Sequence, residues 1–304
     1  DYGTYYANIH SSNTLALTKT QITETAYSST IVGVFHFGTF SSSDYSSAYS
    51  TVSAAATAGH VYSDTSPGTY SWGTLNSVDT STSRQTGYSW TPSSAITGNV
   101  LIVGGGGGGG PGADSQHWSS GGGGGKVENL TNQTISAGTY TIIVGDGNVQ
   151  GSGGTTSSAF GTSAAGGGAG SVGTSGTSGS GNGPGSNSGY NVGGGGGDAA
   201  SGGNAGSWGG TGGDGSNVSW LDGSVYGEQV SGKAYFGGGG YGGDTNGTLT
   251  NGKGNGVSGT GGGGTNGGTG RSGIVVINNT IEAVSISDTP KDSATYNLKY
   301  LLTT

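Results

Sequence analysis

Three aspartates at the ends of glycine runs have a spacing that could bind calcium. The stretches GGGGGD, GGTGGD and GGYGGD end at Asp198, Asp214 and Asp244, and each fits the G-G-x-G-x-D core of a calcium-binding nonapeptide. That repeat places an aliphatic residue two positions after the aspartate, but here alanine, serine or asparagine stands there. The aspartates also lie 16 and 30 residues apart, whereas tandem nonapeptides would place them about nine apart. We therefore expect these aspartates to keep the loop turns soluble, and we expect no metal site.

Glycine-rich phosphate-binding motifs are also matched only in part. G-x-G-x-x-G occurs often in this background, but no predicted helix follows any of the runs, as a dinucleotide site requires. Around Lys126, Ser120 stands where a P-loop needs glycine, and Val127 replaces the hydroxyl residue that would contact Mg²⁺. The sequence therefore predicts no nucleotide cofactor.

Residues for metal binding or nucleophilic catalysis are not grouped along the chain. The four histidines are His10, His36, His60 and His117. None of them has a histidine, cysteine or carboxylate residue at metal-ligand spacing. The chain has no cysteine, and no G-x-S-x-G elbow distinguishes one of its many serines. Nothing pairs any two of the 16 acidic residues as in a glycosidase. We expect no enzymatic activity.

The composition excludes some partners. Charged residues make up only 8% of the chain, and the net charge is −8. Phosphate backbones and anionic membranes are therefore poor partners. No run of about 18 apolar residues is present, so we expect no membrane insertion. Low charge, many hydroxyl groups and the lack of cysteine suit a surface exposed outside cells.

The distribution of glycine divides the chain into segments. Residues 1–103 hold 8 of the 74 glycines, residues 104–273 hold the other 66, and residues 274–304 hold none. We predict an N-terminal β domain over 1–86, a glycine-rich domain over 87–278 and a C-terminal β segment over 279–304. That last segment would serve assembly or return to pair with the N-terminal strands.

Runs of β-branched and aromatic residues bounded by Gly, Pro or Ser predict an all-β fold. Such strands are expected over residues 29–41, 68–75, 86–92, 99–103, 137–147, 271–278, 282–287 and 294–303. Residues 42–60 are the only stretch that could hold a helical turn. We expect a β-sandwich-like N-terminal segment, with strands framing the glycine-rich material.

The glycine runs themselves could form three structures. A disordered linker is typical of such composition, and ordinary strands are poor because glycine has no side chain to pack. The third structure is a bundle of polyglycine II helices, in which backbone N–H and C=O groups point sideways to neighbouring chains that a Cβ would keep apart. We predict this bundle for residues 104–270. Its helices would be the runs 104–110, 121–125, 193–197, 237–240 and 261–264.

The order of motifs in residues 87–278 resembles a known family. An aromatic strand leads to "NVLIVGGGGGGGPG", then "GGGGG", "ISAGTYTIIVGDG", "SSAFG", further glycine runs and a closing "GGTGRSGIVVIN". This order is similar to that of the glycine-rich domains of bacteriophage tail-fibre and adhesin proteins. The resemblance implies a rigid core of glycine helices and variable loops that contact host receptors. "VSISDTPKDSATYNLKY" (284–300) more weakly resembles a phrase of marine phage virion structural proteins.

Aromatic residues within the glycine-rich segment lie mainly between the runs. Rigid aromatic rings with neighbouring polar groups are typical of binding loops. The residues that we predict to bind a receptor are His117, Trp118, Trp208, Trp220, Asp222, Tyr226, Tyr241 and Asp244. The alternative is that their rings cap the bundle or pack between subunits.

These observations predict a structural and binding protein without catalysis. We expect a part of a phage virion appendage, a tail fibre or its tip, that binds a glycan or protein receptor of the host. Its other partners would be further virion proteins and copies of itself. The alternative is a subunit of a bacterial extracellular filament or cell-surface adhesin that assembles by strand addition. A soluble protein that binds ice or polysaccharide is a third class, and it would present a flat, regular face.

Overall fold

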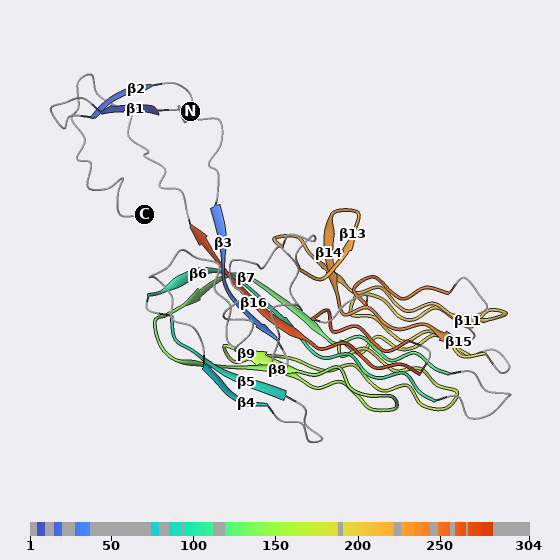
Figure 1. The fold of residues 1–304 in the computed structure, drawn as a ribbon. Helices are drawn as coiled ribbons and strands as arrows, with labels where there is room; N and C mark the ends of the chain where they lie inside the picture. The colour runs from blue at the N-terminus through green and yellow to red at the C-terminus, as the bar shows by residue number, and fades with distance from the viewer. Residues whose placement is uncertain are drawn as a thin grey trace, which may run out of the picture.

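The computed structural model describes most of the glycine-rich part of the chain and portions of both flanks (Figure 1). The described residues are 5–9, 15–19, 28–36, 74–78, 85–92, 94–111, 119–187, 191–221, 226–243, 249–255, 259–265 and 267–281. They form strands, turns and extended chain without any helix, so they hold none long and apolar enough to cross a membrane. The all-β prediction is confirmed. The predicted helical turn in 42–60 and the strands 282–287 and 294–303 lie outside these residues.

Antiparallel sheets make up the wide end of the molecule. A four-stranded sheet has the order β3 (Ser28–His36), β16 (Ile274–Ile281), β6 (Ile96–Val103) and β7 (Val127–Ile135). A five-stranded sheet has the order β10 (Thr162–Ala164), β9 (Ser157–Ala159), β8 (Tyr140–Gly145), β5 (Gln85–Trp90) and β4 (Thr74–Val78). A three-stranded sheet has the order β12 (Ser216–Val218), β14 (Lys233–Phe236) and β13 (Glu228–Val230). Two pairs stand apart, β1 (Tyr5–Ile9) with β2 (Leu15–Lys19) and β11 (Gly209–Gly210) with β15 (Gly242–Gly243).

The four-stranded sheet lies between the other two, and its inner strands β6 and β16 are largely buried on both faces. On β16, Val275 and Ile277 pack into the core shared with the five-stranded sheet, whereas Ile274 and Val276 pack against the three-stranded sheet. Successive side chains of a strand point to opposite faces, so a strand buried on both sides needs a continuous apolar run. The stretches NVLIV and GIVVI of β6 and β16 have this pattern.

Several strand predictions are confirmed within a few residues. The stretches 29–41, 86–92, 99–103, 137–147 and 271–278 overlap β3, β5, β6, β8 and β16, respectively. Sequence reasoning missed β7 because its residues VENLTNQTI are mostly polar, and all but the buried Ile135 are partly or fully exposed at a sheet edge. Strand β3 pairs with β16, and β4 pairs with β5, so strands from the predicted N-terminal domain belong to the same sheets as strands of the glycine-rich part. The division of the chain at residue 86 stays a prediction.

The glycine runs form a polyglycine II bundle, as predicted. In the run 104–110, every third N–H group donates to the same neighbouring tract. Residues 104, 107 and 110 donate to 120–126, residues 105 and 108 to 152–155, and residues 106 and 109 to 268–271, at N···O distances of 2.8–3.1 Å. Carbonyl groups of the run accept from three further tracts, 148–151, 167–170 and 264. A repeat of three residues and six neighbours around one chain are the pattern of polyglycine II.

Close approach of the backbones explains why these residues must be glycine. A Cβ built on Gly107 would lie 2.0 Å from the Gly168 oxygen, and a Cβ on Gly122 would lie 2.0 Å from the Gly107 oxygen. Both distances are far shorter than any van der Waals contact, so the lattice has no room for a side chain at these positions.

Outer tracts of the bundle need glycine only on their inner side. In TSGTSG (174–179), Gly176 and Gly179 donate to the carbonyls of Gly121 and Gly124, both at 2.8 Å, while Thr174 and Thr177 face solvent. The sequence prediction counted only uninterrupted runs and missed such tracts. Their sequence mark is a glycine at every third position, which matches the three-residue turn.

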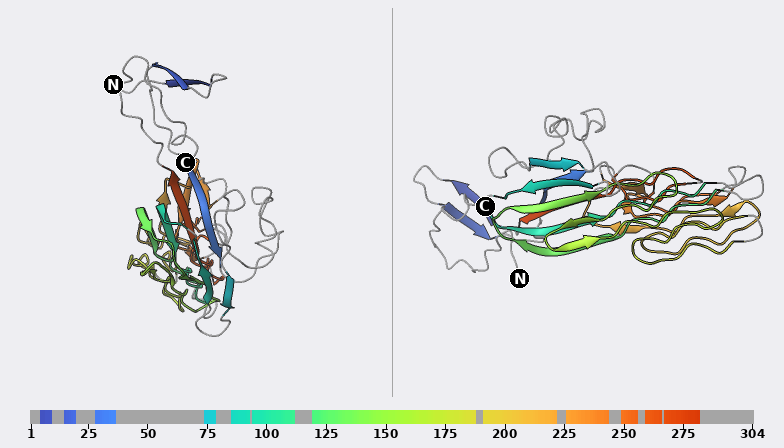
Figure 2. Two further views of the ribbon diagram at one scale, coloured as in Figure 1. Left: turned by 90° about the vertical axis from the view of Figure 1, so that its left-hand side faces the viewer. Right: turned by 90° about the horizontal axis from the view of Figure 1, so that it is seen from below.

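Sheets and bundle share continuous chain segments (Figure 2). Strand β6 continues directly into the run 104–110, the run 121–125 leads through Lys126 into β7, and residues 267–273 lead into β16. The apolar cores of the sheets therefore fix where the glycine tracts start, and the lattice continues away from them.

A single methyl group tests the lattice. We expect Gly107→Ala to lower the free energy of unfolding by about 3 kcal/mol or more, because the Cβ overlaps a backbone oxygen that the lattice holds in place. Chemical denaturation measures this. The matched control is Gly183→Ala, whose Cβ meets no atom within 4 Å. Equal stability of the two variants would contradict the close-packed lattice.

Candidate functional site

The end of the bundle farthest from the three large sheets, here called the distal end, is made of turns. Tracts leave the sheets, reverse there and return, as the turns 149–152, 171–174 and 206–209 do (Figure 1). The short pair of β11 and β15 lies at this end (Figure 1). Gly243 donates to the carbonyl of Ser119 at 2.9 Å, which joins two further tracts there. The lattice therefore holds several turns together in a fixed arrangement.

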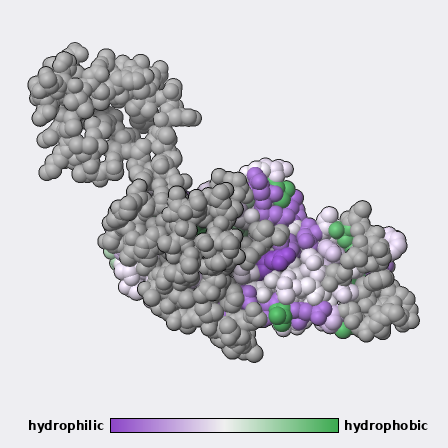
Figure 3. Space-filling model, in the orientation of Figure 1, coloured by the Kyte–Doolittle hydropathy of each residue, from purple (hydrophilic) through white to green (hydrophobic). Residues whose placement is uncertain are grey.

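Exposed large apolar side chains gather at the distal end. Among the described residues, Val149, Val172 and Trp208 are 47%, 48% and 51% exposed. Each of the three belongs to a distal turn. The face of the bundle seen in Figure 3 is otherwise mostly pale and purple, with few green patches. Sequence reasoning selected Trp208 but missed both valines, although each stands in a Gly- and Ser-rich turn, where a valine has no packing role.

The structure separates the predicted receptor residues into two groups. Trp208 and the half-buried Tyr241 are at the distal end, next to the paired glycines of β11 and β15. Trp220 and Tyr226 lie instead beside the three-stranded sheet. Tyr226 is only 6% exposed and packs in the core, and the Trp220 Nε1 donates to the Asn129 Oδ1 of β7 at 2.8 Å. The other predicted residues, His117, Trp118, Asp222 and Asp244, lie outside the described residues.

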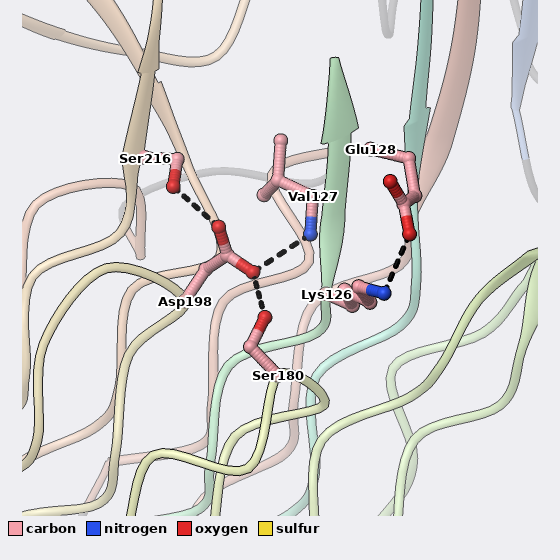
Figure 4. A network of polar contacts seen from close by, with 6 residues as sticks. All are labelled: Lys126, Val127, Glu128, Ser180, Asp198 and Ser216. Carbon is pink, nitrogen blue, oxygen red and sulfur yellow. Dashed lines mark hydrogen bonds and ion pairs between the residues drawn. The ribbon is translucent and has the colours of Figure 1, made fainter. Parts of the chain in front are cut away.

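Asp198 joins the lattice to the sheets (Figure 4). One carboxylate oxygen accepts the N–H of Val127 at 2.9 Å and the hydroxyl of Ser180, and the other accepts the hydroxyl of Ser216. Val127 is the first residue of β7, so its N–H comes where the glycine run ends. The carboxylate accepts a backbone N–H that a carbonyl of a neighbouring tract would accept inside the lattice. The sequence predicted only that Asp198 keeps a turn soluble.

Two ion pairs lie near the same boundary. The Lys126 Nζ is 2.6 Å from the Glu128 Oε1, and this hydrogen bond raises the pKa of the lysine. Asp214 accepts the Lys253 N–H at 3.0 Å and its Nζ at 2.7 Å, and that ammonium lies 5.6 Å from the centre of the Tyr235 ring. Burial alone would raise the pKa of Asp214, but the bonds from Lys253 lower the pKa below its ordinary 3.8. Within the described ranges, no three His, Asp or Glu side chains are grouped to hold a metal ion.

The chain matches a known protein family. The family model described as a glycine-rich domain matches residues 80–279, which are 200 of the 304 residues. This match confirms the predicted glycine-rich domain. No curated protein and no solved structure matches the chain.

Removal of the Asp198 carboxylate tests the junction. Asp198→Ala leaves the Val127 N–H without its acceptor, and we expect a loss of about 1–3 kcal/mol in the free energy of unfolding. Hydrogen exchange of the Val127 amide should become faster, while amides of β16 keep their relative protection. Unchanged exchange at Val127 would contradict the role of Asp198.

The Asp214–Lys253 pair predicts a dependence of stability on pH. Because the folded-state pKa of Asp214 is lowered, its stabilisation is present above the unfolded-state pKa and is lost as the pH falls through the folded-state value. Wild type should therefore be more stable than Asp214→Asn at pH 7 and equally stable in strong acid. The difference should be small, because both side chains are 44% exposed. Urea denaturation between pH 7 and pH 2 measures it, and a difference independent of pH would contradict the prediction.

Proposed function

We propose that this chain, which belongs to the glycine-rich domain family, is a structural part of a phage virion appendage that presents its distal end to a host receptor. The observation that carries the proposal is that Val149, Val172 and Trp208, the exposed large apolar residues among those described, each stand in a distal turn. Single exposed apolar residues are ordinary on a protein surface, but their concentration at the tip of an elongated body suits an interaction site.

The lattice supports this function through rigidity. A binding loop that is mobile before it binds loses conformational entropy on binding, and this loss weakens the affinity. The distal turns are tied at both ends to tracts that the lattice holds by hydrogen bonds, so they lose little freedom on binding. The Trp208 ring then offers a large amphipathic surface at low entropic cost.

The order of the strand and glycine motifs in residues 87–278 supports the phage assignment, since it resembles that of tail-fibre and adhesin proteins. A phage appendage works outside cells, which agrees with the low charge and the many hydroxyl side chains of the chain. Further virion proteins and copies of the same chain are the proposed assembly partners, and a glycan or protein on the host surface is the proposed receptor.

Trp208 provides the test of receptor binding. We expect the fluorescently labelled chain to bind some strains of a bacterial panel, and Trp208→Ala to reduce the bound amount at least tenfold without a change in melting temperature. Trp220→Ala, beside the three-stranded sheet, is the control and should retain binding if it folds. Loss of binding in Trp220→Ala alone would move the receptor site away from the distal end. Antibody labelling of purified particles should mark their appendages, and labelling of long uniform filaments would contradict the virion assignment.

A further inference from the structure

A hollow lies at the end of the sheets opposite to the bundle. It has a volume of about 480 Å³ and is open to the surface, and its lining residues are Thr134, Ile135, Thr139, Tyr140, Thr141, Phe160 and Gly161. Strand β7 joins the bundle at Val127 and β8 joins it at Gly145, so Ile135 and Tyr140 are at their remote ends. The volume falls within the range of about 300–1,000 Å³ that is typical of small-molecule sites.

Aromatic rings line this hollow. The rings of Tyr140 and Phe160 meet edge to face, with centroids 5.1 Å apart, and both contact the fully buried Trp90 behind them. The Tyr140 hydroxyl donates to the Ser136 carbonyl at 2.9 Å, which fixes the ring in place. The indole N–H of Trp90 is buried without a hydrogen-bond partner among the described residues. Half-exposed rings on a rigid support therefore form the apolar part of the hollow.

Phe160 occupies a backbone position that disfavours it. With Gly161 it makes the two-residue turn between the paired residues Ala159 and Thr162, and its φ is 51°. Such turns prefer Asn, Asp or Gly because a left-handed conformation costs other residues about 1–2 kcal/mol. A bulky ring at this position acts against the local preference, and strain of this kind concentrates at ligand sites. The ring packs against Trp90 and Tyr140 at the edge of the core, and in this position it also lines the hollow.

The polar part of the lining consists of hydroxyl groups. Thr134, Thr139 and Thr141 are exposed at the rim, and the Thr139 Oγ1 lies 3.0 Å from the Thr91 Oγ1. None of the lining residues is charged. A hydroxyl both donates and accepts hydrogen bonds, so this rim suits a neutral ligand that is rich in hydroxyls.

We propose that this hollow binds a neutral saccharide, one of whose pyranose rings lies with its C–H face on Tyr140 and Phe160. The hydroxyls of that sugar exchange hydrogen bonds with the rim threonines. This ligand class combines an apolar ring face with hydroxyl groups and no charge, as the lining does. The site lies at the opposite end of the molecule from Trp208, so it does not depend on the proposed receptor function.

Removal of hydroxyl groups without loss of volume tests the proposal. The labelled full chain is applied to an array of neutral and sialylated oligosaccharides, together with the double variant Thr139→Val/Thr141→Val. We expect binding to at least one neutral glycan, reduced at least tenfold in this variant. The control is Thr177→Val, an exposed threonine along the side of the bundle, and this variant and Trp208→Ala should both bind like wild type.

A second variant tests the aromatic surface. Phe160→Asn suits the left-handed turn and removes the ring, so binding of the same neutral glycan should fall at least tenfold. The proposal is overturned if no neutral glycan binds, or if Thr139→Val/Thr141→Val binds like wild type. It is also overturned if Phe160→Asn binds the same glycan like wild type. If no neutral glycan binds and Phe160→Asn changes the sedimentation coefficient of the chain, the hollow is a contact between copies instead.

Discussion

The structure depends on hydrogen bonds between backbones that no side chain separates. Glycine loses more conformational freedom on folding than any other residue, so an isolated run would stay disordered. In the bundle, the N–H groups of the run 104–110 reach three neighbouring tracts and its carbonyls reach three more. Each such bond contributes only about 0.5–1.5 kcal/mol net, so stability requires many parallel tracts at once. The lattice is therefore cooperative, and a Cβ at its inner glycine positions would overlap a neighbouring backbone.

The apolar cores of the sheets position the first glycine tracts of the lattice. Polyglycine has no apolar side chains to drive collapse, whereas β6 and β16 bury Leu101, Ile102, Val275 and Val276 completely. These strands continue directly into glycine tracts, so their hydrophobic cores set the positions of the first tracts. Where the lattice meets the sheet, Asp198 accepts the Val127 N–H. The two ends of the molecule then offer different surfaces, apolar turns at the distal end and a hydroxyl-rimmed aromatic hollow at the other.

Much of this architecture is readable in the sequence, for identifiable reasons. Continuous apolar runs predicted β6 and β16, and long glycine runs predicted the inner tracts because no other structure needs so many absent side chains. The outer tracts were missed because their glycines recur singly at every third position, and β7 was missed because its edge position tolerates polar residues. At the candidate site, Trp208 could be selected by residue type, but the exposure of Val149 and Val172 depends on tertiary structure. The core position of Tyr226 likewise follows from the packing of β14 against the central sheet, which its glycine-rich surroundings do not reveal.

Residue-resolved amide hydrogen exchange of the full chain tests the central claim most directly. If lateral hydrogen bonds hold the bundle, the amides of Gly105, Gly106 and Gly107 should exchange at least a thousandfold more slowly than those of an unfolded glycine peptide. Their protection should equal that of Val275 in β16, because lattice and sheet would open together. Exchange of these glycine amides at the unfolded rate, beside a protected β16, would show that the glycine tracts are not hydrogen-bonded and would contradict the account.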